Sequence, residues 1–107
     1  MGRNLSLSSD SRATVGVTTN YSAASGQILL IDTSSAILTV TLPSNPSVGD
    51  RINMIDAAGN CGTNKAVISR NGNKIANLSE DLDFDIRNTS LELIYTGPTY
   101  GWSILSN

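Results

Sequence analysis

Residues 27–42 read QILLIDTSSAILTVTL, and this stretch predicts the fold class of the chain. Its first part, 28–31, is an unbroken apolar run, which is typical of a strand covered on both faces. The middle, 32–35, consists of Asp, Thr and Ser, whose side chains bond nearby backbone amides and favour a turn. Apolar residues then alternate over 36–42 until Pro43, which removes an amide donor. The stretch therefore predicts a central strand, a turn and a second, half-buried strand.

The same pattern of short apolar runs and turn residues continues in both directions from this stretch. Apolar runs of about four to seven residues are separated by Gly, Asn, Asp, Pro and Ser at intervals of roughly ten residues. No window has helical period, and about a third of the chain is Ser, Thr or Asn. We expect an all-β protein with a single antiparallel sandwich or jelly-roll-like domain of about eight strands. The expected strands cover 12–19, 27–32, 36–42, 51–56, 65–70, 74–76, 80–86 and 90–96, and the last strand contains Tyr100, Trp102 and Ile104.

Asn71 and Gly72 form the strongest turn signal in the sequence. Both central positions of a type I′ turn need residues that tolerate a positive φ, and Asn followed by Gly meets this need. We therefore predict a hairpin that joins the strand at 65–70 to the returning segment 74–76.

Composition removes several functional classes. The chain has 107 residues, 15% of them charged, and a net charge of −2, which gives no basis for binding a phosphate backbone. Neither a membrane-spanning apolar run nor a signal-peptide pattern is present, so we expect a soluble chain without a membrane partner. With no His and one Cys, catalysis by Ser-His or Cys-His, histidine metal sites and an internal disulfide are excluded. We expect no cofactor and no bound metal.

Residues 1–11 read as an N-terminal arm, and 12–107 as the folded module. In this polar segment only Leu5 and Leu7 offer apolar contact. Residues two apart point to one side of an extended chain, so the two leucines would face a neighbouring subunit together. The plain alternative is an unanchored chain end.

The acidic residues do not make a convincing catalytic pair. Asp81, Asp83 and Asp85 alternate along one predicted strand and would project from one side at about 7 Å spacing, which suits a cation or acid–base chemistry. We favour the simpler reading of a charged strand face that resists aggregation. Asp32, Asp50 and Asp56 each stand at the end of a strand, where Asp most often closes a turn.

Two further side chains, Cys61 and Trp102, are candidate functional groups. Cys61 has no His or other cationic neighbour in its turn to lower its pKa, so we expect an inert thiol. Trp102 would suit sugar stacking if exposed, with Tyr100 close by, but a chain with one Trp and one Phe needs its aromatic residues in the core. We therefore expect Trp102 to be buried.

A resemblance emerges from the order and spacing of short elements between 21 and 105. These elements are ASGQ (24–27), LIDTS (30–34), TVTLP (39–43), VGD (48–50), IDA (55–57), NGNKI (71–75), LIYTG (93–97) and YGW (100–102). Together they resemble a small β-module of tail fibres, tailspikes and other surface proteins of tailed phages. The resemblance implies a non-enzymatic module of antiparallel strands that forms a homotrimer.

The functional expectation is a virion structural protein. A module with one short arm suits a capsid decoration or cement protein that binds the major capsid protein through Leu5 and Leu7. A small core also favours association with sister subunits. The alternative is the receptor-binding tip of a tail fibre or tailspike, which would contact bacterial surface glycan through Trp102 and Tyr100. A polysaccharide-cleaving tailspike would need a carboxylate pair in a groove. A lone free thiol fits assembly in the reducing host cytoplasm before the protein joins the virion.

Overall fold

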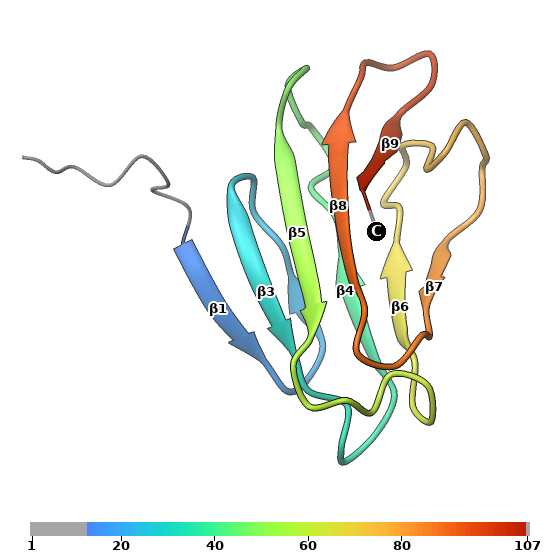
Figure 1. Ribbon diagram of the computed structural model, residues 1–107. Helices are drawn as coiled ribbons and strands as arrows, with labels where there is room; N and C mark the ends of the chain where they lie inside the picture. The colour runs from blue at the N-terminus through green and yellow to red at the C-terminus, as the bar shows by residue number, and fades with distance from the viewer. Residues whose placement is uncertain (1–12, 107) are drawn as a thin grey trace, which may run out of the picture.

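The computed structural model of the chain describes residues 13–106, which Figure 1 shows as strands joined by loops. The described part is all-β and contains no helix, as expected. Its nine strands are β1 (Ala13–Val17), β2 (Tyr21–Ser22), β3 (Gln27–Ile31), β4 (Leu38–Thr41), β5 (Arg51–Asp56), β6 (Ala66–Ser69), β7 (Leu82–Phe84), β8 (Ser90–Tyr95) and β9 (Trp102–Ser106). The predicted arm, with Leu5 and Leu7, lies outside the described residues.

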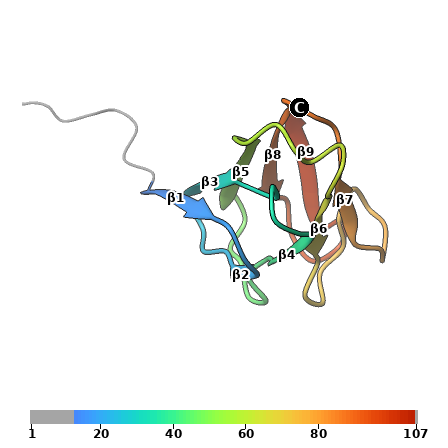
Figure 2. The same ribbon diagram turned by 90° about the horizontal axis from the view of Figure 1, so that it is seen from below.

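The strands form two mixed sheets. The five-stranded sheet has the order β1-β3-β5-β8-β9, and the four-stranded sheet has the order β2-β4-β6-β7. Figure 2 shows the sheets as two layers that face each other. Along β4 and β8 every second residue is buried, so each strand turns alternate side chains inward.

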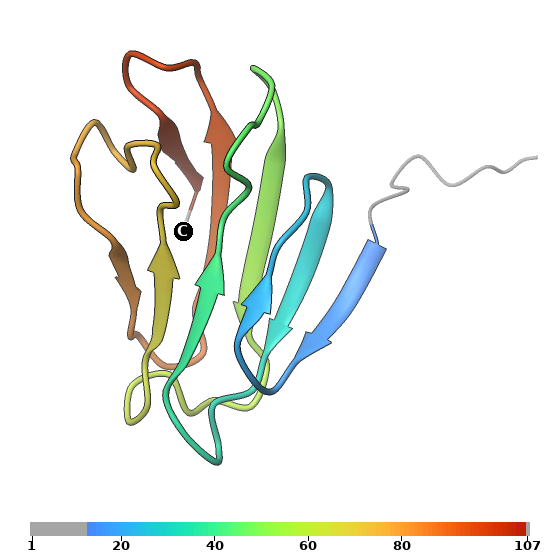
Figure 3. The same ribbon diagram turned by 180° about the vertical axis from the view of Figure 1, so that it is seen from behind.

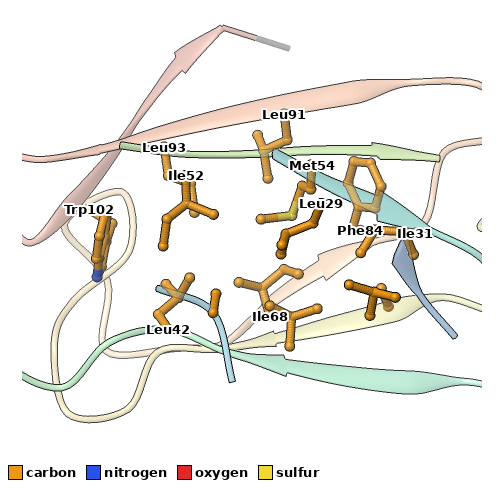
Figure 4. Close-up of a cluster of buried hydrophobic side chains, with 14 of the residues drawn as sticks. Leu29, Ile31, Leu42, Ile52, Met54, Ile68, Phe84, Leu91, Leu93 and Trp102 are labelled. Atoms are coloured by element: carbon orange, nitrogen blue, oxygen red, sulfur yellow. The ribbon is translucent and has the colours of Figure 1, made fainter. Parts of the chain in front are cut away.

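The core fills the space between the two layers. Figure 4 shows side chains from both sheets meeting there, with Trp102 at one end. The five-stranded sheet contributes residues such as Leu29, Ile31, Ile52, Met54, Leu91 and Leu93, and the other sheet and its loops contribute Val40, Leu42, Ile68 and Phe84. All of these are buried. Burial of this apolar surface provides the main stabilisation of the fold.

The first six strands wind around the core, alternating between the sheets. Strands β1, β3 and β5 pair in parallel in one sheet, and β2, β4 and β6 pair in parallel in the other. Each successive pair of strands therefore makes one turn of a winding that stacks on the turn before it (Figure 3). This corrects the predicted antiparallel fold. The turn residues predict reversals beside the preceding strand, whereas these connections carry the chain across to the facing sheet.

Antiparallel pairing begins only after β6. Strand β7 lies against β6, while β8 returns beside β5 and β9 pairs with β8. The last three strands therefore add to the C-terminal end of the winding, and β1 and β2 remain the edge strands at its N-terminal end.

The turn at Asn71 and Gly72 is present, but the predicted hairpin is not. Both residues have positive φ, 50° and 92°, and Asn73 N–H donates to Arg70 O at 3.2 Å. The chain then leaves β6, because Trp102 N–H donates to Lys74 O at 2.8 Å. The edge of β9 thus captures the segment that was expected to return along β6.

The observed strands differ from the expected strands at two short elements. Strand β2 has two residues, too few for the alternation that identifies a strand. The expected strand at 74–76 is reduced to bridges from Ile75 to Leu78 and Trp102. In residues 13–106 there is no helix of sufficient length and apolarity to span a membrane.

Candidate functional site

Trp102 lies at the start of β9 and is completely buried, with 0% of its surface exposed. Its ring meets Tyr95 edge-on, with the ring centroids 5.3 Å apart and an interplanar angle of 61°. The hydroxyl of Tyr95 donates to Asn73 Oδ1 at 3.1 Å. The prediction of a core Trp102 is confirmed. In this fold the indole cannot stack on a sugar, so its assignment as a glycan contact is wrong.

Tyr100 remains accessible, with 57% of its surface exposed. It lies in the turn between β8 and β9, where Gly101 N–H donates to Gly97 O at 2.8 Å. The Thr96 hydroxyl donates to Gly101 O at 2.7 Å and closes the same turn. These bonds fix the backbone beside Tyr100, so the exposed ring projects from an ordered turn.

Two exposed apolar residues lie on loops beside this turn, and we call Val48, Leu78 and Tyr100 the loop-tip surface. Val48 is 73% exposed and Leu78 is 55% exposed. Asn77 N–H donates to Tyr100 O at 3.3 Å, and Val48 adjoins Gly97. Figure 1 shows these loops at the same end of the molecule. A sugar site needs converging polar groups, whereas an apolar set suits contact with protein.

Sequence reasoning identified only Tyr100 of this surface. Val48 and Leu78 lie within segments that the sequence predicts to be connections between strands. The available signal was a large apolar residue among turn residues. Such a side chain has no periodic partner and must either fold back or stay exposed.

A hollow of about 190 Å³ opens between β7, the start of β8 and Ile104 of β9. Leu82, Phe84, Leu91 and Ile104 supply apolar lining, while Asp83 and Asp85 also border it. Ile86 extends this lining and is exposed, because β7 ends at Phe84 and the third apolar residue of the pattern passes beyond the sheet. The sequence predicts a strand over the whole of 80–86, which would keep Ile86 within the sheet, so the hollow was not expected.

The acidic residues around β7 face solvent, as predicted. Asp81, Asp83 and Asp85 are all exposed. Lys65 Nζ lies 3.1 Å from Asp83 Oδ2, and both side chains remain substantially exposed. Asp81 Oδ1 accepts the backbone N–H of Arg70 at 2.9 Å. These contacts give two of the carboxylates ordinary structural roles.

Asp56 is the most buried carboxylate among the described residues, with 3% of its surface exposed. Its oxygens accept the backbone N–H groups of Asn88 at 2.9 Å, Asn60 at 3.2 Å and Cys61 at 3.3 Å. Burial by itself would raise the pKa of Asp56, but these donors and the Cys61 side chain hold that pKa below its ordinary value. Asp56 therefore ties the turn after β5 to the turn before β8.

Two other carboxylates close their own turns, as predicted. Asp32 Oδ1 accepts the Ser34 hydroxyl at 2.6 Å and the Ser34 backbone N–H at 2.9 Å. The hydroxyl and then the backbone N–H of Ser34 lower the pKa of Asp32. Asp50 Oδ2 accepts the Ser47 backbone N–H at 2.8 Å. These Asp side chains stabilise loops.

Cys61 is a buried free thiol. Burial, followed by the neighbouring Asp56 carboxylate, raises the pKa of Cys61 to about 12. A thiol with so high a pKa is almost wholly protonated at neutral pH and is a poor nucleophile.

Residues 13–106 contain no group of three or more Cys, Asp or Glu side chains that could hold a metal ion. The surface features that the fold creates are the loop-tip surface, the hollow beside β7 and the faces and edges of the two sheets. No protein-family model matches the chain, and a search of the curated proteins finds no match either.

Proposed function

We propose that this chain is a non-enzymatic structural protein of a tailed-phage virion, which binds the capsid exterior as a decoration or cement protein and acts as a homotrimer. The sequence resemblance to phage surface modules supports the class of protein. The observation that carries the assembly part of the proposal is a group of four apolar residues on the outside of the five-stranded sheet.

The outer face of the five-stranded sheet is formed by residues that alternate with the buried ones. Ile28 and Leu30 of β3 and Ile94 of β8 are half-buried there, and Ile55 of β5 is 38% exposed. Leu30 and Ile55 are paired across the ladder. The same face also carries Arg51, Asn53 and Glu92, and Arg51 Nη1 lies 3.8 Å from Glu92 Oε2. We call its four apolar residues, Ile28, Leu30, Ile55 and Ile94, the outer apolar face.

The other sheet has a different outer face. Its β4 and β6 turn Thr39, Thr41, Val67 and Ser69 outward, and Asp83 stands opposite Val67. Only one of these five residues is apolar. Because solvent tolerates this polar face, the contrast singles out the outer apolar face as the one that gains from being covered.

Sister subunits are the occupants that best suit the outer apolar face. The unbroken apolar run 28–31 predicted a strand covered on both faces, yet among residues 13–106 only one face of β3 carries a second layer. A second copy supplies the same apolar surface, so association would bury it on both partners. In a closed trimer the three identical faces would meet at the threefold axis and cover one another without a further protein.

The homotrimer is tested by light scattering after size exclusion on the full chain and on Ile55→Glu. We expect a trimer for the natural sequence and monomers for Ile55→Glu, because a charge in a buried apolar contact is costly. Thr41→Glu, at an outward position of the four-stranded sheet, is the matched control and should remain trimeric. A natural chain that stays monomeric at micromolar concentration would contradict the homotrimer.

The particle contact is assigned to the arm, residues 1–11, and to the major capsid protein as partner. Strand β1, which follows the arm, carries the sequence ATVGV without a charge and lies at a sheet edge. Because β1 is an edge strand, the arm joins the folded part at a place that a neighbouring protein can approach. Leu5→Asp with Leu7→Asp should abolish incorporation into particles, while Ser6→Ala with Ser8→Ala should incorporate normally. Normal incorporation of the leucine variant would refute the arm contact.

The alternative function is a receptor-binding tip module of a tail fibre or tailspike. Its specific support is the exposed ring of Tyr100 on an ordered turn. Under this alternative, Tyr100→Ala would reduce adsorption of phage to host cells. Under the capsid proposal, the same change would leave adsorption unaltered.

A further inference from the structure

The two sheets do not cover each other completely. The five-stranded sheet begins with β1, but the four-stranded sheet begins with β2, which lies opposite the middle of its partner sheet (Figures 2 and 3). No strand among residues 13–106 lies beyond β2, so the inner face of β1 has no facing strand. The place of a fifth strand in the smaller sheet is open.

Apolar side chains are left partly exposed at this open place. Val15 of β1 and Tyr21 of β2 both pack against the core, yet each is only half-buried. Val17, the next inward residue of β1, is fully buried. The core is therefore closed at the end of β1 near its loop and incompletely covered near Val15.

The winding indicates which segment belongs there. From β1 to β6 each strand lies in the sheet opposite to that of the preceding strand. The three connections nearest the N-terminal end, 18–20, 23–26 and 32–37, have three to six residues, and the next two, 42–50 and 57–65, have nine. A strand that preceded β1 by a connection as short as 23–26 would end at residue 8. By the alternation, it would belong to the smaller sheet beside β2.

The sequence at that position has the required pattern. Residues 5–8 read LSLS, so an extended chain would turn Leu5 and Leu7 to one side and Ser6 and Ser8 to the other. The segment is uncharged and contains neither Gly nor Pro. Residues 9–12 would then form the connection to β1, with the same length as the connection 23–26 between β2 and β3.

We propose that, in the free protein, residues 5–8 of the same chain pair in parallel with the outer edge of β2 and add a fifth strand to the smaller sheet. Leu5 and Leu7 cover the partly exposed Val15 and Tyr21, and the two serines face solvent. The strand also satisfies backbone groups at the edge and blocks that edge against other chains.

This inference does not rest on the proposed function. The two are nevertheless linked, because Leu5 and Leu7 cannot cover their own core and contact a coat protein at once. If the edge pairing and the capsid contact both occur, Leu5 and Leu7 leave the edge of β2 when the protein binds a particle and contact the coat protein instead. The edge of β2 is then open.

Hydrogen exchange at the Ser22 amide shows whether the outer edge of β2 is paired. Ala23 N–H donates to Thr41 O at 2.8 Å, toward β4. Since amides alternate in direction along a strand, Ser22 N–H points to the outer edge. Its hydrogen exchange is fast if the edge is open and slow if residues 5–8 are paired there.

Residue-resolved hydrogen exchange on the full chain therefore tests the proposal. We expect Ser22 to exchange at least about tenfold more slowly in the natural chain than in Leu5→Asp with Leu7→Asp. The matched control, Ser6→Asp with Ser8→Asp, places the same charges on the solvent side and should keep the protection. The exchange rates of core amides such as Leu29 should be the same in the natural chain and in the variants. If the Asp substitutions change these core rates, the milder variant Leu5→Ala with Leu7→Ala is used in their place.

Equal exchange of Ser22 in the natural chain and in the leucine variants would overturn the proposal. Protection that disappears on dilution would also overturn it, because the occupant would then be the arm of a second copy. Particle incorporation is a separate readout, so failure of the edge pairing and failure of the capsid proposal are distinguishable.

Discussion

Gly101 occupies a position that admits no side chain. Its φ is +78°, and a Cβ there would overlap the carbonyl group of Lys74, which accepts the N–H of Trp102 at 2.8 Å. We expect Gly101→Ala to lower the free energy of unfolding by at least about 3 kcal/mol, measured by urea denaturation. Gly72→Ala is the control, because Gly72 has a similar φ of +92° with open space around it, and should cost about 1–2 kcal/mol. Equal losses would contradict this explanation.

Trp102 is the largest of the fully buried side chains. Removing its ring would leave a cavity at one end of the core and delete the contact with Tyr95. We expect Trp102→Ala to cost about 3–5 kcal/mol in a denaturant melt. A cost below about 1 kcal/mol would show that the ring is not a core element.

Asp56 makes stability depend on pH. Its pKa is lowered in the folded protein, so its contribution is present above the ordinary Asp pKa and is lost as the pH falls through the folded pKa. We expect Asp56→Asn to cost about 1–3 kcal/mol at pH 7, because the three N–H donors lose their carboxylate. The difference from the natural chain should shrink below about pH 4. A difference that does not change between pH 7 and pH 3, or an equal cost for the exposed Asp85→Asn, would contradict this role.

Strand β7 has one face that is buried and an opposite face that is acidic and exposed. Phe84 is buried while Asp83 is exposed, and the ion pair of Asp83 with Lys65 is solvent-screened. Asp83→Asn should therefore change the free energy of unfolding by less than about 0.5 kcal/mol. Chemical denaturation of this variant beside Phe84→Ala, which should cost about 3–5 kcal/mol, separates the two faces. A large cost for Asp83→Asn would mean that the carboxylate has a further structural partner.

Strand positions could be predicted from the sequence because alternation and turn residues are local signals. The runs at 27–32, 36–42 and 51–56 correspond to β3, β4 and β5. Strand direction could not be predicted in this way. A turn after residue 31 reads the same whether the chain returns beside its own strand or crosses to the facing sheet. Parallel partners such as Ile28 and Asn53 are far apart in sequence, and no local pattern links them.

The candidate site could be predicted only in part, for a similar reason. The burial of Trp102 followed from the scarcity of aromatic residues, and the turn roles of Asp32, Asp50 and Asp56 followed from their places at strand ends. The loop-tip surface depends on three loops meeting, which the winding brings about. The outer apolar face could not be recognised until the winding had placed Ile55 beside Leu30.

At the scale of the whole molecule, the winding separates surfaces of different character. One outer face carries four apolar residues beside the Arg51–Glu92 ion pair, the other is mostly polar, and β1 and β2 form the N-terminal edges of the two sheets. Under the proposed function, the outer apolar face would join sister subunits and the arm would contact the coat, so the two contacts would use separate surfaces.

Cryo-electron microscopy of intact virions tests the proposal that the protein decorates the capsid exterior as a homotrimer. We expect trimeric density on the outside of the head, with the face that contains Ile28, Leu30, Ile55 and Ile94 buried between the three copies. Particles grown without the protein should lack this density. Density for the protein at the tail tip alone, with a bare head, would contradict the claim and favour the receptor-binding alternative.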